Sequence, residues 1–543
     1  MKPDIYPDLF NYVYGPVMQP GSSSHTAGPC RVGLLAAGLL GEPVRDIHVT
    51  LDPAGSFAGA FGIMAEDNAM IAGAMGLGPD DQRLFDAGAL ARAAGIAYRF
   101  DFAPIKESSH PNAMKFRLTG QGGRQVELVG DSTGGGLVET RSIEGFPVRL
   151  AGDAHTLLLK DPDSILGPEA LAGVARSIPG LIRVESFREP GRGALHVFFS
   201  SRPIAPATWP TEVLALEKHG LDPILPVIRP ENRKPPLFST MAEWKEAAAK
   251  SNWSLARAVV QYQMDASGWD EKQVREYLRF LTAKMHRQTH AAYEENLPVP
   301  ESPFKMDYPA LWTKHAASGR TLSDGLTAAI IRLAYGAGAG LPGVETVTGP
   351  MGSGGGYLYA ALYAVMKARR WAEDKLPDGL LVAGGVGLLA FFRTEPTGEC
   401  LGCTGECGVN GAMAAAGLVE MAGGTPDQVE AAASLSLQGS LGWPCDPIPG
   451  GFGQPCRGRI MTSTCMAPVF ADMALAGHPA VLSLDEALDA ADRVGRALPP
   501  ELLCTSRGGA AAAPSAREKA LAFKKWFEES RKAGRRIPPG NLI

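Results

Sequence analysis

Six of the eight cysteines in this 543-residue chain lie between Cys400 and Cys465. Cys400, Cys403 and Cys407 form a Cys-x2-Cys-x3-Cys run, and Cys445 and Cys456 follow about forty residues later, each directly after a proline. Soft metal ions and iron–sulfur clusters gather thiolates from a few loops into one place, whereas structural thiols are scattered through a core. The spacing therefore predicts a metal or iron–sulfur cofactor.

Two other uses of cysteine compete with this prediction. A disulfide framework is disfavoured because the chain is large and shows no secretory signal. A structural zinc site stays open: Cys-x2-Cys is half of a zinc ribbon, although ten residues, not two to four, separate Cys445 from Cys456. We expect Cys30, Cys465 and Cys504 to be ordinary buried thiols.

A second polar stretch, Ser22-Ser23-Ser24-His25-Thr26, precedes an apolar helix expected over residues 31–40. Hydroxyls and unpaired amides at the positive end of a helix can hold a carboxylate or a phosphate. A run of this kind can equally be a capping loop without a ligand. The residues alone leave both interpretations open.

Both stretches resemble the iron–sulfur-dependent L-serine dehydratases. Gly-Cys403-Thr-Gly-Glu-Cys-Gly-Val-Asn-Gly, Pro-Cys445-Asp-Pro and Gln-Pro-Cys456 are similar to the catalytic part of that family, and Gly-Ser-Ser-Ser-His-Thr-Ala-Gly-Pro is similar to the signature of its smaller domain. In the family, three cysteines hold a 4Fe–4S cluster and leave one iron without a protein ligand. The resemblance implies Cys403, Cys445 and Cys456 as those ligands, with Cys400 and Cys407 as additional thiols.

The resemblance also implies an activity, the conversion of L-serine to pyruvate and ammonia. An iron lacking a fourth protein ligand would act as a Lewis acid on the substrate hydroxyl. His25 is the candidate base or proton shuttle, because an imidazole titrates near neutral pH. Other polar residues would hold the substrate carboxylate beside the iron: Ser22, Ser23, Ser24, Thr26 and Ser353.

Three positions depart from the family pattern and leave the substrate open. Met64 stands where the family usually has a histidine, and Met351 and Gly352 replace polar residues in the glycine-rich loop 348–356. A related β-hydroxy amino acid is therefore a second substrate class. A cluster- or zinc-bearing relative that acts on another small hydroxy acid, or a non-catalytic binding protein, is the alternative function.

The elements that position these residues predict a multidomain α+β chain. Alternating residues at 47–51 and 114–118 predict half-buried strands, and the first domain resembles the family's α/β beta-type domain. A short unit with strands near 156–160, 181–188 and 195–199 resembles an ACT fold, and prolines then predict an extended linker. The predicted boundaries are 1–145, 146–205 for the ACT-like unit, 206–240 for the linker, 241–520 for an all-α catalytic domain and 521–543 for a tail.

Amphipathic periodicity predicts the helices of the catalytic domain, as at Leu255, Val259 and Tyr262. Thr425 with Gln428, and Ser483 with Glu486, are capping boxes that open two further helices. His286 and His290 lie four apart and could share a metal, but such a pair is more often only a polar helix face. The basic, aromatic tail is expected to pack against the body or a second subunit.

Composition limits the partners. The chain carries 52 basic and 57 acidic residues, a net charge of −5, which gives no reason to expect nucleic acid or an anionic membrane as a partner. The longest apolar run, 379–392, is about fourteen residues and too short to span a bilayer, so we expect a buried core element. We expect a cytoplasmic homodimer acting on a small amino acid.

Overall fold

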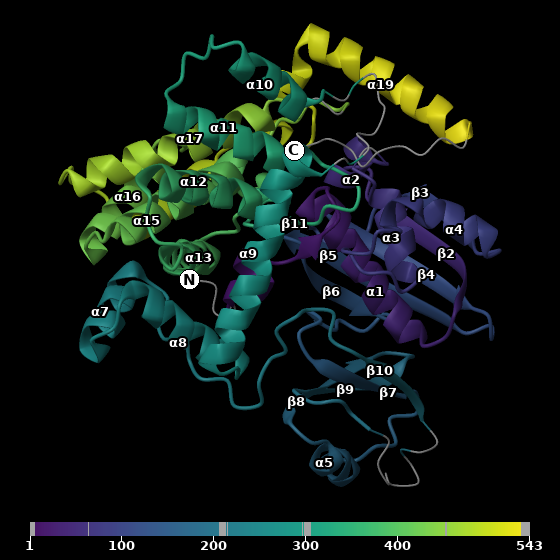
Figure 1. Ribbon diagram of the computed structural model, residues 1–543. Helices are drawn as coiled ribbons and strands as arrows, with labels where there is room; N and C mark the ends of the chain where they lie inside the picture. The colour runs from purple at the N-terminus through teal and green to yellow at the C-terminus, as the bar shows by residue number, and fades with distance from the viewer. Residues whose placement is uncertain are drawn as a thin grey trace.

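The structure is a computed structural model. It describes residues 6–62, 64–205, 213, 216–295, 297, 304, 306–450 and 453–533. Part of the predicted linker (206–212, 214 and 215), the last ten residues of the predicted tail and Ile63 lie outside the described residues. Figure 1 shows an α/β domain beside a larger helical domain, with a small sheet below both, so the predicted mixed α+β class is confirmed.

The first domain is a five-stranded sheet with helices on one face. The strand order is β3-β2-β4-β5-β6, in which β2 and β3 are parallel and the other pairs are antiparallel. Ile47, Val49 and Leu51 alternate toward the helices and are buried, which confirms the predicted alternation. The elements are α1 (Gly28–Leu40), β2 (Val44–Leu51), α2 (Ser56–Ala60), α3 (Glu66–Ala74), α4 (Ala87–Ala93), β3 (Ala97–Phe102), β4 (Ala113–Gly120), β5 (Gln125–Gly134) and β6 (Leu137–Ile143).

The small unit is an antiparallel sheet of order β10-β7-β9-β8 with one helix. Three of its strands, β7, β8 and β9, lie where the sequence predicts them, but β10 falls inside the segment predicted to be an extended linker. The reason is local: between Pro210 and Pro223 the chain has no proline, so its amides can pair with β7. The elements are β7 (His155–Asp161), α5 (Pro168–Ser177), β8 (Leu181–Glu189), β9 (Gly193–Ser200) and β10 (Glu217–Leu221).

The helical domain is built around α13, which packs against α8 and α15 in one large apolar core. The predicted capping boxes at Thr425 and Ser483 are present. The long helices are α7 (Met241–Ser251), α8 (Leu255–Ser267), α9 (Glu271–Glu294), α10 (Tyr308–Ala317), α11 (Gly325–Ala337), α12 (Gly354–Arg369), α13 (Lys375–Arg393), α15 (Val409–Ala422), α16 (Pro426–Gln438), α17 (Cys456–Leu475) and α18 (Leu484–Arg496).

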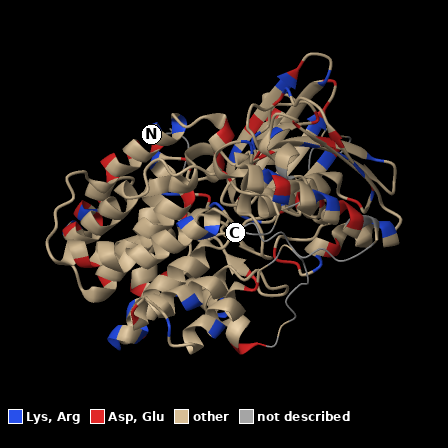
Figure 2. Ribbon diagram, turned by 90° about the horizontal axis from the view of Figure 1, so that it is seen from above, with Lys and Arg blue, Asp and Glu red and all other residues tan. Residues whose placement is uncertain are grey.

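Helix α13 contains the apolar run that the sequence analysis judged too short for a membrane. The helix extends over 19 residues, so by length and composition it could cross one. Its most apolar window is 83% buried against other elements, which agrees with the predicted core element. Figure 2 shows long stretches of helix without charged residues, and acidic and basic residues interspersed over the rest of the protein.

Two segments near the N-terminus, inside the predicted domain 1–145, contact the helical domain. The π-helical turn η1 (Leu9–Val13) is buried in the core of that domain, where the Leu9 amide donates to Gln263 and the Tyr14 hydroxyl donates to the Leu380 carbonyl. Strand β1 (Val17–Met18) then pairs with β11 (Thr346–Val347). This two-residue sheet joins the beginning of the chain to the glycine-rich loop and is the strand pair that an all-α prediction misses.

The C-terminal helix α19 (Pro514–Lys532) also crosses a predicted boundary, because the division at 520/521 falls inside it. Phe523 and Phe527 are buried, and the Phe523 ring makes an edge contact with Phe304. The tail therefore packs against the body of the protein, as the amphipathic pattern predicts.

Candidate active site between the two larger domains

The polar stretch of the first domain, here called the serine loop (residues 21–27), is a buried π-helical turn. Ser22 caps η2 (Ser23–Ala27), and its hydroxyl accepts from the His25 amide at 3.2 Å. The Thr26 hydroxyl donates to the Met64 carbonyl at 2.8 Å. Helix α1 continues directly from this turn, so the buried helix holds the loop in place.

The His25 ring lies in a hydrogen-bonded chain that crosses from the first domain to the helical domain. The Ser24 hydroxyl donates to Glu399 Oε1 at 2.7 Å and lies 2.9 Å from His25 Nδ1. His25 Nδ1 is 3.4 Å from the same carboxylate oxygen. His25 Nε2 is buried and has no hydrogen-bond partner among the described residues.

Burial lowers the pKa of His25, and the Glu399 charge offsets this only in part. Burial opposes ionisation of Glu399, but His25, the Ser24 hydroxyl and Asn112 together hold the pKa of this carboxyl below its usual value. The resting pair is therefore a neutral imidazole beside a carboxylate. Such an imidazole can accept a proton at the ring nitrogen that faces away from the carboxylate.

Four thiols of the helical domain gather in what we call the cysteine cluster: Cys403, Cys407, Cys445 and Cys456. They come from the π-helical turn η4 (Thr404–Gly408) and the residue before it, from the loop at 445, and from the first residue of α17. All four are buried. Hydrogen bonds from the other three thiols hold the pKa of Cys403 well below the ordinary thiol value.

Among the described residues, one cation contacts this cluster. Arg459 Nη1 lies 3.8 Å from Cys403 Sγ and donates to Asp446 Oδ1 and to the Pro444 carbonyl, both at 2.6 Å. The second carboxylate oxygen of Asp446 accepts from the Ala510 amide at 2.6 Å. Arg459 and Asp446 thus tie the loop at 445, helix α17 and the chain near 510 to one another.

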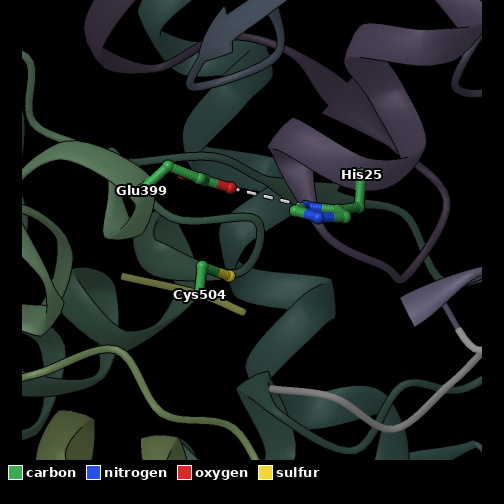
Figure 3. A group of neighbouring side chains, drawn as sticks. All are labelled: His25, Glu399 and Cys504. Atoms are coloured by element: carbon green, nitrogen blue, oxygen red, sulfur yellow. Dashed lines mark ion pairs between the residues drawn. The ribbon is translucent and has the colours of Figure 1, made fainter. Parts of the chain in front are cut away.

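Cys504 connects the cysteine cluster to His25. Its amide donates to the Cys445 carbonyl at 2.7 Å, and the two thiols hydrogen-bond. Ligand atoms of Cys504, Glu399 and His25 all lie within 4.8 Å of one another, and Figure 3 shows the three side chains facing a common point. The cluster and the serine loop therefore belong to one continuous site.

The glycine-rich loop 348–356 closes the site from a third side. A Cβ atom at Gly352 would lie 2.3 Å from the Gly21 carbonyl oxygen, so the loop touches the serine loop through its backbone. The same Cβ position would lie 3.1 Å from the Ser23 amide nitrogen, and the buried hydroxyl of the next residue, Ser353, has no hydrogen-bond partner among the described residues. Met351 is fully buried in the same apolar group as Cys403, Cys407 and Cys445.

The structure thus brings the polar candidates His25, Ser22, Ser23, Ser24, Thr26 and Ser353 to one side of the site and Cys403, Cys445 and Cys456 to the other. Cys400 lies apart, with its thiol donating to Glu395 at 3.2 Å. Cys30 donates to the Leu77 carbonyl and is an ordinary buried thiol, as predicted. His286 and His290 stack on each other with ring centres 4.0 Å apart, and the Tyr359 hydroxyl hydrogen-bonds with His286 Nδ1.

Sequence reasoning missed three residues of the site: Glu399, Arg459 and Cys504. Glu399 and Arg459 lie within four residues of predicted ligands, Cys403 and Cys456, but nearness in sequence does not show which way a side chain points. Cys504 was assigned as an ordinary thiol. The signal that could have found it is the segment from Gly508 onward, which resembles the family's closing segment and lies four residues away.

Comparisons with known proteins agree with this arrangement. Residues 242–511 match the family model described as "Serine dehydratase alpha chain". The chain is 36% identical over 169 residues to "Probable L-serine dehydratase, alpha chain" of Bacillus subtilis, which covers 31% of this chain and 56% of that relative. It is 36% identical over 173 residues to "Probable L-serine dehydratase, beta chain" of the same organism, covering 31% of this chain and 74% of that relative.

A third relative is "L-serine dehydratase" of Mycobacterium bovis, 40% identical over 176 residues, which are 31% of this chain and 38% of that relative. The aligned part thus spans little more than half of the alpha-chain relative and less than half of the mycobacterial one. Relatives named as alpha and as beta chains both match this single chain.

Proposed function

Because this chain belongs to the L-serine dehydratase family, we propose that it is an iron–sulfur-dependent dehydratase and ammonia-lyase. Its substrate would be L-serine or a related β-hydroxy amino acid, and its products a 2-oxo acid and ammonia. The observation that carries the proposal is the convergence of the buried sulfurs of Cys403, Cys445 and Cys456 on a site that continues to His25.

The residues fit a 4Fe–4S cluster by the chemistry of their donor set. Buried thiols from three separate segments supply soft ligands, and the Arg459 guanidinium offsets part of the negative charge that thiolates bring. Cys403, Cys445 and Cys456 would hold the cluster. When bound, it would supply a Lewis acid that makes the substrate hydroxyl a better leaving group.

The remaining residues would bind the substrate and move its proton. The serine loop lies at the start of α1, where hydroxyls and amides suit a carboxylate, and Ser353 adds a buried hydroxyl without a partner among the described residues. His25 Nε2 would take the α proton, because it carries a lone pair and no competing hydrogen bond. The enamine formed by loss of water would tautomerise and hydrolyse to the 2-oxo acid and ammonia.

A second substrate class is favoured by the apolar residues at the site. Met64 is buried, with its carbonyl bonded by Thr26, and Met351 is buried among the cysteines. Two polar contacts of the usual family pattern are therefore replaced by thioether side chains. We therefore propose a β-hydroxy amino acid with an additional alkyl group on the β carbon as the second substrate class.

A zinc-binding, non-catalytic role is the alternative, and Cys407 favours it. Its thiol bonds that of Cys403, so four thiols are available, which is the number that structural zinc takes. Metal analysis separates the two roles. We also propose a homodimer, which sedimentation of the intact chain would test.

The test is assay of anaerobically purified protein for iron, zinc, acid-labile sulfide and 2-oxo acid production from L-serine and other β-hydroxy amino acids. The proposal predicts iron and sulfide in equal amounts and a 2-oxo acid product. Cys465→Ser is the matched control for serine substitution of the three ligands, because Cys465 is half-buried on α17 and outside the cysteine cluster. Stoichiometric zinc without sulfide, and no product from any substrate, would contradict the proposal.

A further inference from the structure

The hydrogen-bonded chain of Glu399, Ser24 and His25 joins the two domains inside the candidate site. We propose that Glu399 is a positioning residue that acts through the Ser24 hydroxyl: it fixes the tautomer of His25 and stabilises the ring after it has taken a proton. The inference rests on the proposed function and adds to it, because neither Glu399 nor this use of Ser24 follows from the sequence.

The direction of each hydrogen bond follows from the number of protons. A serine hydroxyl has one hydrogen, and a carboxylate can only accept. At 2.7 Å from Glu399 Oε1, the Ser24 hydrogen points to the carboxylate. The Ser24 oxygen can then only accept from His25 Nδ1, 2.9 Å away, so Nδ1 carries the ring hydrogen and Nε2 carries the lone pair.

The carboxylate of Glu399 is important because the three side chains are buried. His25 is fully buried, and Ser24 and Glu399 are 4% and 6% exposed. When Nε2 takes a proton, the imidazolium forms 3.4 Å from the charged oxygen of Glu399, so the charge is compensated where it arises. Without Glu399, the same proton would leave an uncompensated charge in a dry site.

Other groups also face this chain. The Cys504 thiol approaches from the closing part of the chain, and the Phe57 ring packs edge-on against the imidazole at 5.1 Å. His110 lies close enough to Glu399 for the carboxylate to influence its pKa, and the buried Glu406 lies near Cys504. Glu399 is the group among these that joins His25 through a shared hydroxyl.

The position of Glu399 also links the base to the metal ligands. It lies in the short helix α14 (Gly398–Leu401), four residues before Cys403, whereas Ser24 and His25 lie on the first domain. The hydrogen bonds from Glu399 through Ser24 to His25 therefore align His25 with the cysteine cluster across the contact between the two domains. A displacement of either domain would break them.

The experiment compares Glu399→Gln, Ser24→Ala and Ser24→Thr, with Glu420→Gln on α15 as the matched carboxyl-to-amide control. In Glu399→Gln, an amide hydrogen can point at Ser24, which reverses the bonds and moves the ring hydrogen to Nε2. We expect kcat to fall about 100-fold, within the range that a correctly placed base contributes. The acid limb of the kcat/KM profile should move to lower pH, because the charge that raises the pKa of His25 is gone. Ser24→Ala should lose about tenfold, and Ser24→Thr should recover most of that loss.

Iron and sulfide are measured in every variant. Glu399→Gln with normal iron, kcat within twofold and an unmoved acid limb would overturn the proposal. If Glu399→Gln loses iron, the two Ser24 variants test the proposal instead. Equal activity and equal pH profiles in Ser24→Ala and Ser24→Thr would overturn the proposal. Higher activity in Ser24→Thr than in Ser24→Ala would support it. Nitrogen-15 NMR of labelled histidine in iron-free protein tests the Nδ1–H tautomer directly, so the inference stays testable even if no β-hydroxy amino acid is deaminated.

Discussion

The two halves of the site are built in the same way from different chemistry. In each, a π-helical turn runs straight into a buried helix: η2 into α1 in the first domain, and η4 into α15 in the helical domain. π-Helical turns open the backbone and are frequent at functional sites. One turn presents hydroxyls and an imidazole, and the other presents thiols.

The difference lies in how each half is stabilised. The hydroxyls of Ser22, Ser24 and Thr26 all take part in hydrogen bonds inside the protein, so the serine loop is ordered by its own contacts. The thiols of the cysteine cluster bond mainly to one another, and Arg459 is the cation that contacts them. Cys403 has a lowered pKa whereas Cys407, Cys445 and Cys456 have raised ones, so these thiols resist ionising together, and we propose that a bound metal would stabilise them as a set. The first half is preorganised, and the second would be completed by the proposed cofactor.

The largest difference between the two halves is expected when the metal is lost. Chelation, or Cys403→Ser, is expected to abolish 2-oxo acid production, a loss of at least about 100-fold, since a Lewis acid supplies several kcal/mol of the barrier reduction. Hydrogen exchange should rise in 403–408, 445–450 and 453–456 and stay unchanged in 21–27. An equal rise of hydrogen exchange in both halves would contradict the claim that only the cysteine half depends on metal. Cys465→Ser is the control.

Removal of the cation tests the charge of the sulfur half. Arg459→Gln is expected to lower iron affinity by about 10- to 100-fold, the usual effect of losing a group that supports metal ligands. Arg459→Lys should recover part of the loss. The readout is iron retained against a competing chelator. Arg493→Gln on α18, outside the cysteine cluster, is the matched control. Unchanged retention in Arg459→Gln would show that the thiols need no compensating charge.

Filling the backbone contact between the halves should have a smaller effect. Gly352→Ala places a methyl group 2.3 Å from the Gly21 carbonyl, and overpacking of this kind costs about 1–3 kcal/mol. We expect a lower unfolding midpoint and a raised KM. Gly325→Ala is the control, because nothing lies within 4 Å of its Cβ position. Identical midpoints for the two variants would mean that the loops are not held together as described.

An effect on stability alone, without an effect on the site, is expected at Asp8, remote from both turns. Burial raises its pKa to about 6 from an ordinary 3.8, so the folded state binds this proton more tightly than the unfolded chain. Stability from this group is present at low pH and declines between about pH 4 and pH 6, by about 3 kcal/mol at most. Asp8→Asn should remove that decline in urea unfolding and leave iron content unchanged. If the stability of Asp8→Asn still declines over this pH range, another group causes the decline.

Much of this site could be predicted from sequence because its parts are local motifs. The spacing of the cysteines predicts a metal or iron–sulfur site, and the family resemblance singles out Cys403, Cys445, Cys456 and the run 22–26. The alternation at 47–51 and the capping box at Thr425 predict elements of the two domains. What could not be predicted depends on contacts between distant segments. The β1–β11 pair, the burial of η1 in the helical domain and the meeting of Glu399 with Ser24 leave no local periodicity.

The ACT-like assignment remains a prediction, although a four-stranded sheet with a helix lies at that place. The predicted linker contains strand β10, which its proline content does not indicate, because prolines lie on both sides of a short segment without any. Density of proline describes a segment on average, whereas sheet pairing depends on which amides are free.

The central claim is that Cys403, Cys445 and Cys456 hold an iron–sulfur cluster and leave one iron coordination position for a substrate oxygen. Mössbauer spectroscopy of protein reconstituted with iron-57, recorded with and without L-serine, tests this most directly. The account predicts that one of four iron sites changes when substrate is added, and that the same change occurs in Cys407→Ala. Four iron sites that ignore every β-hydroxy amino acid tried, or the absence of bound iron, would contradict it.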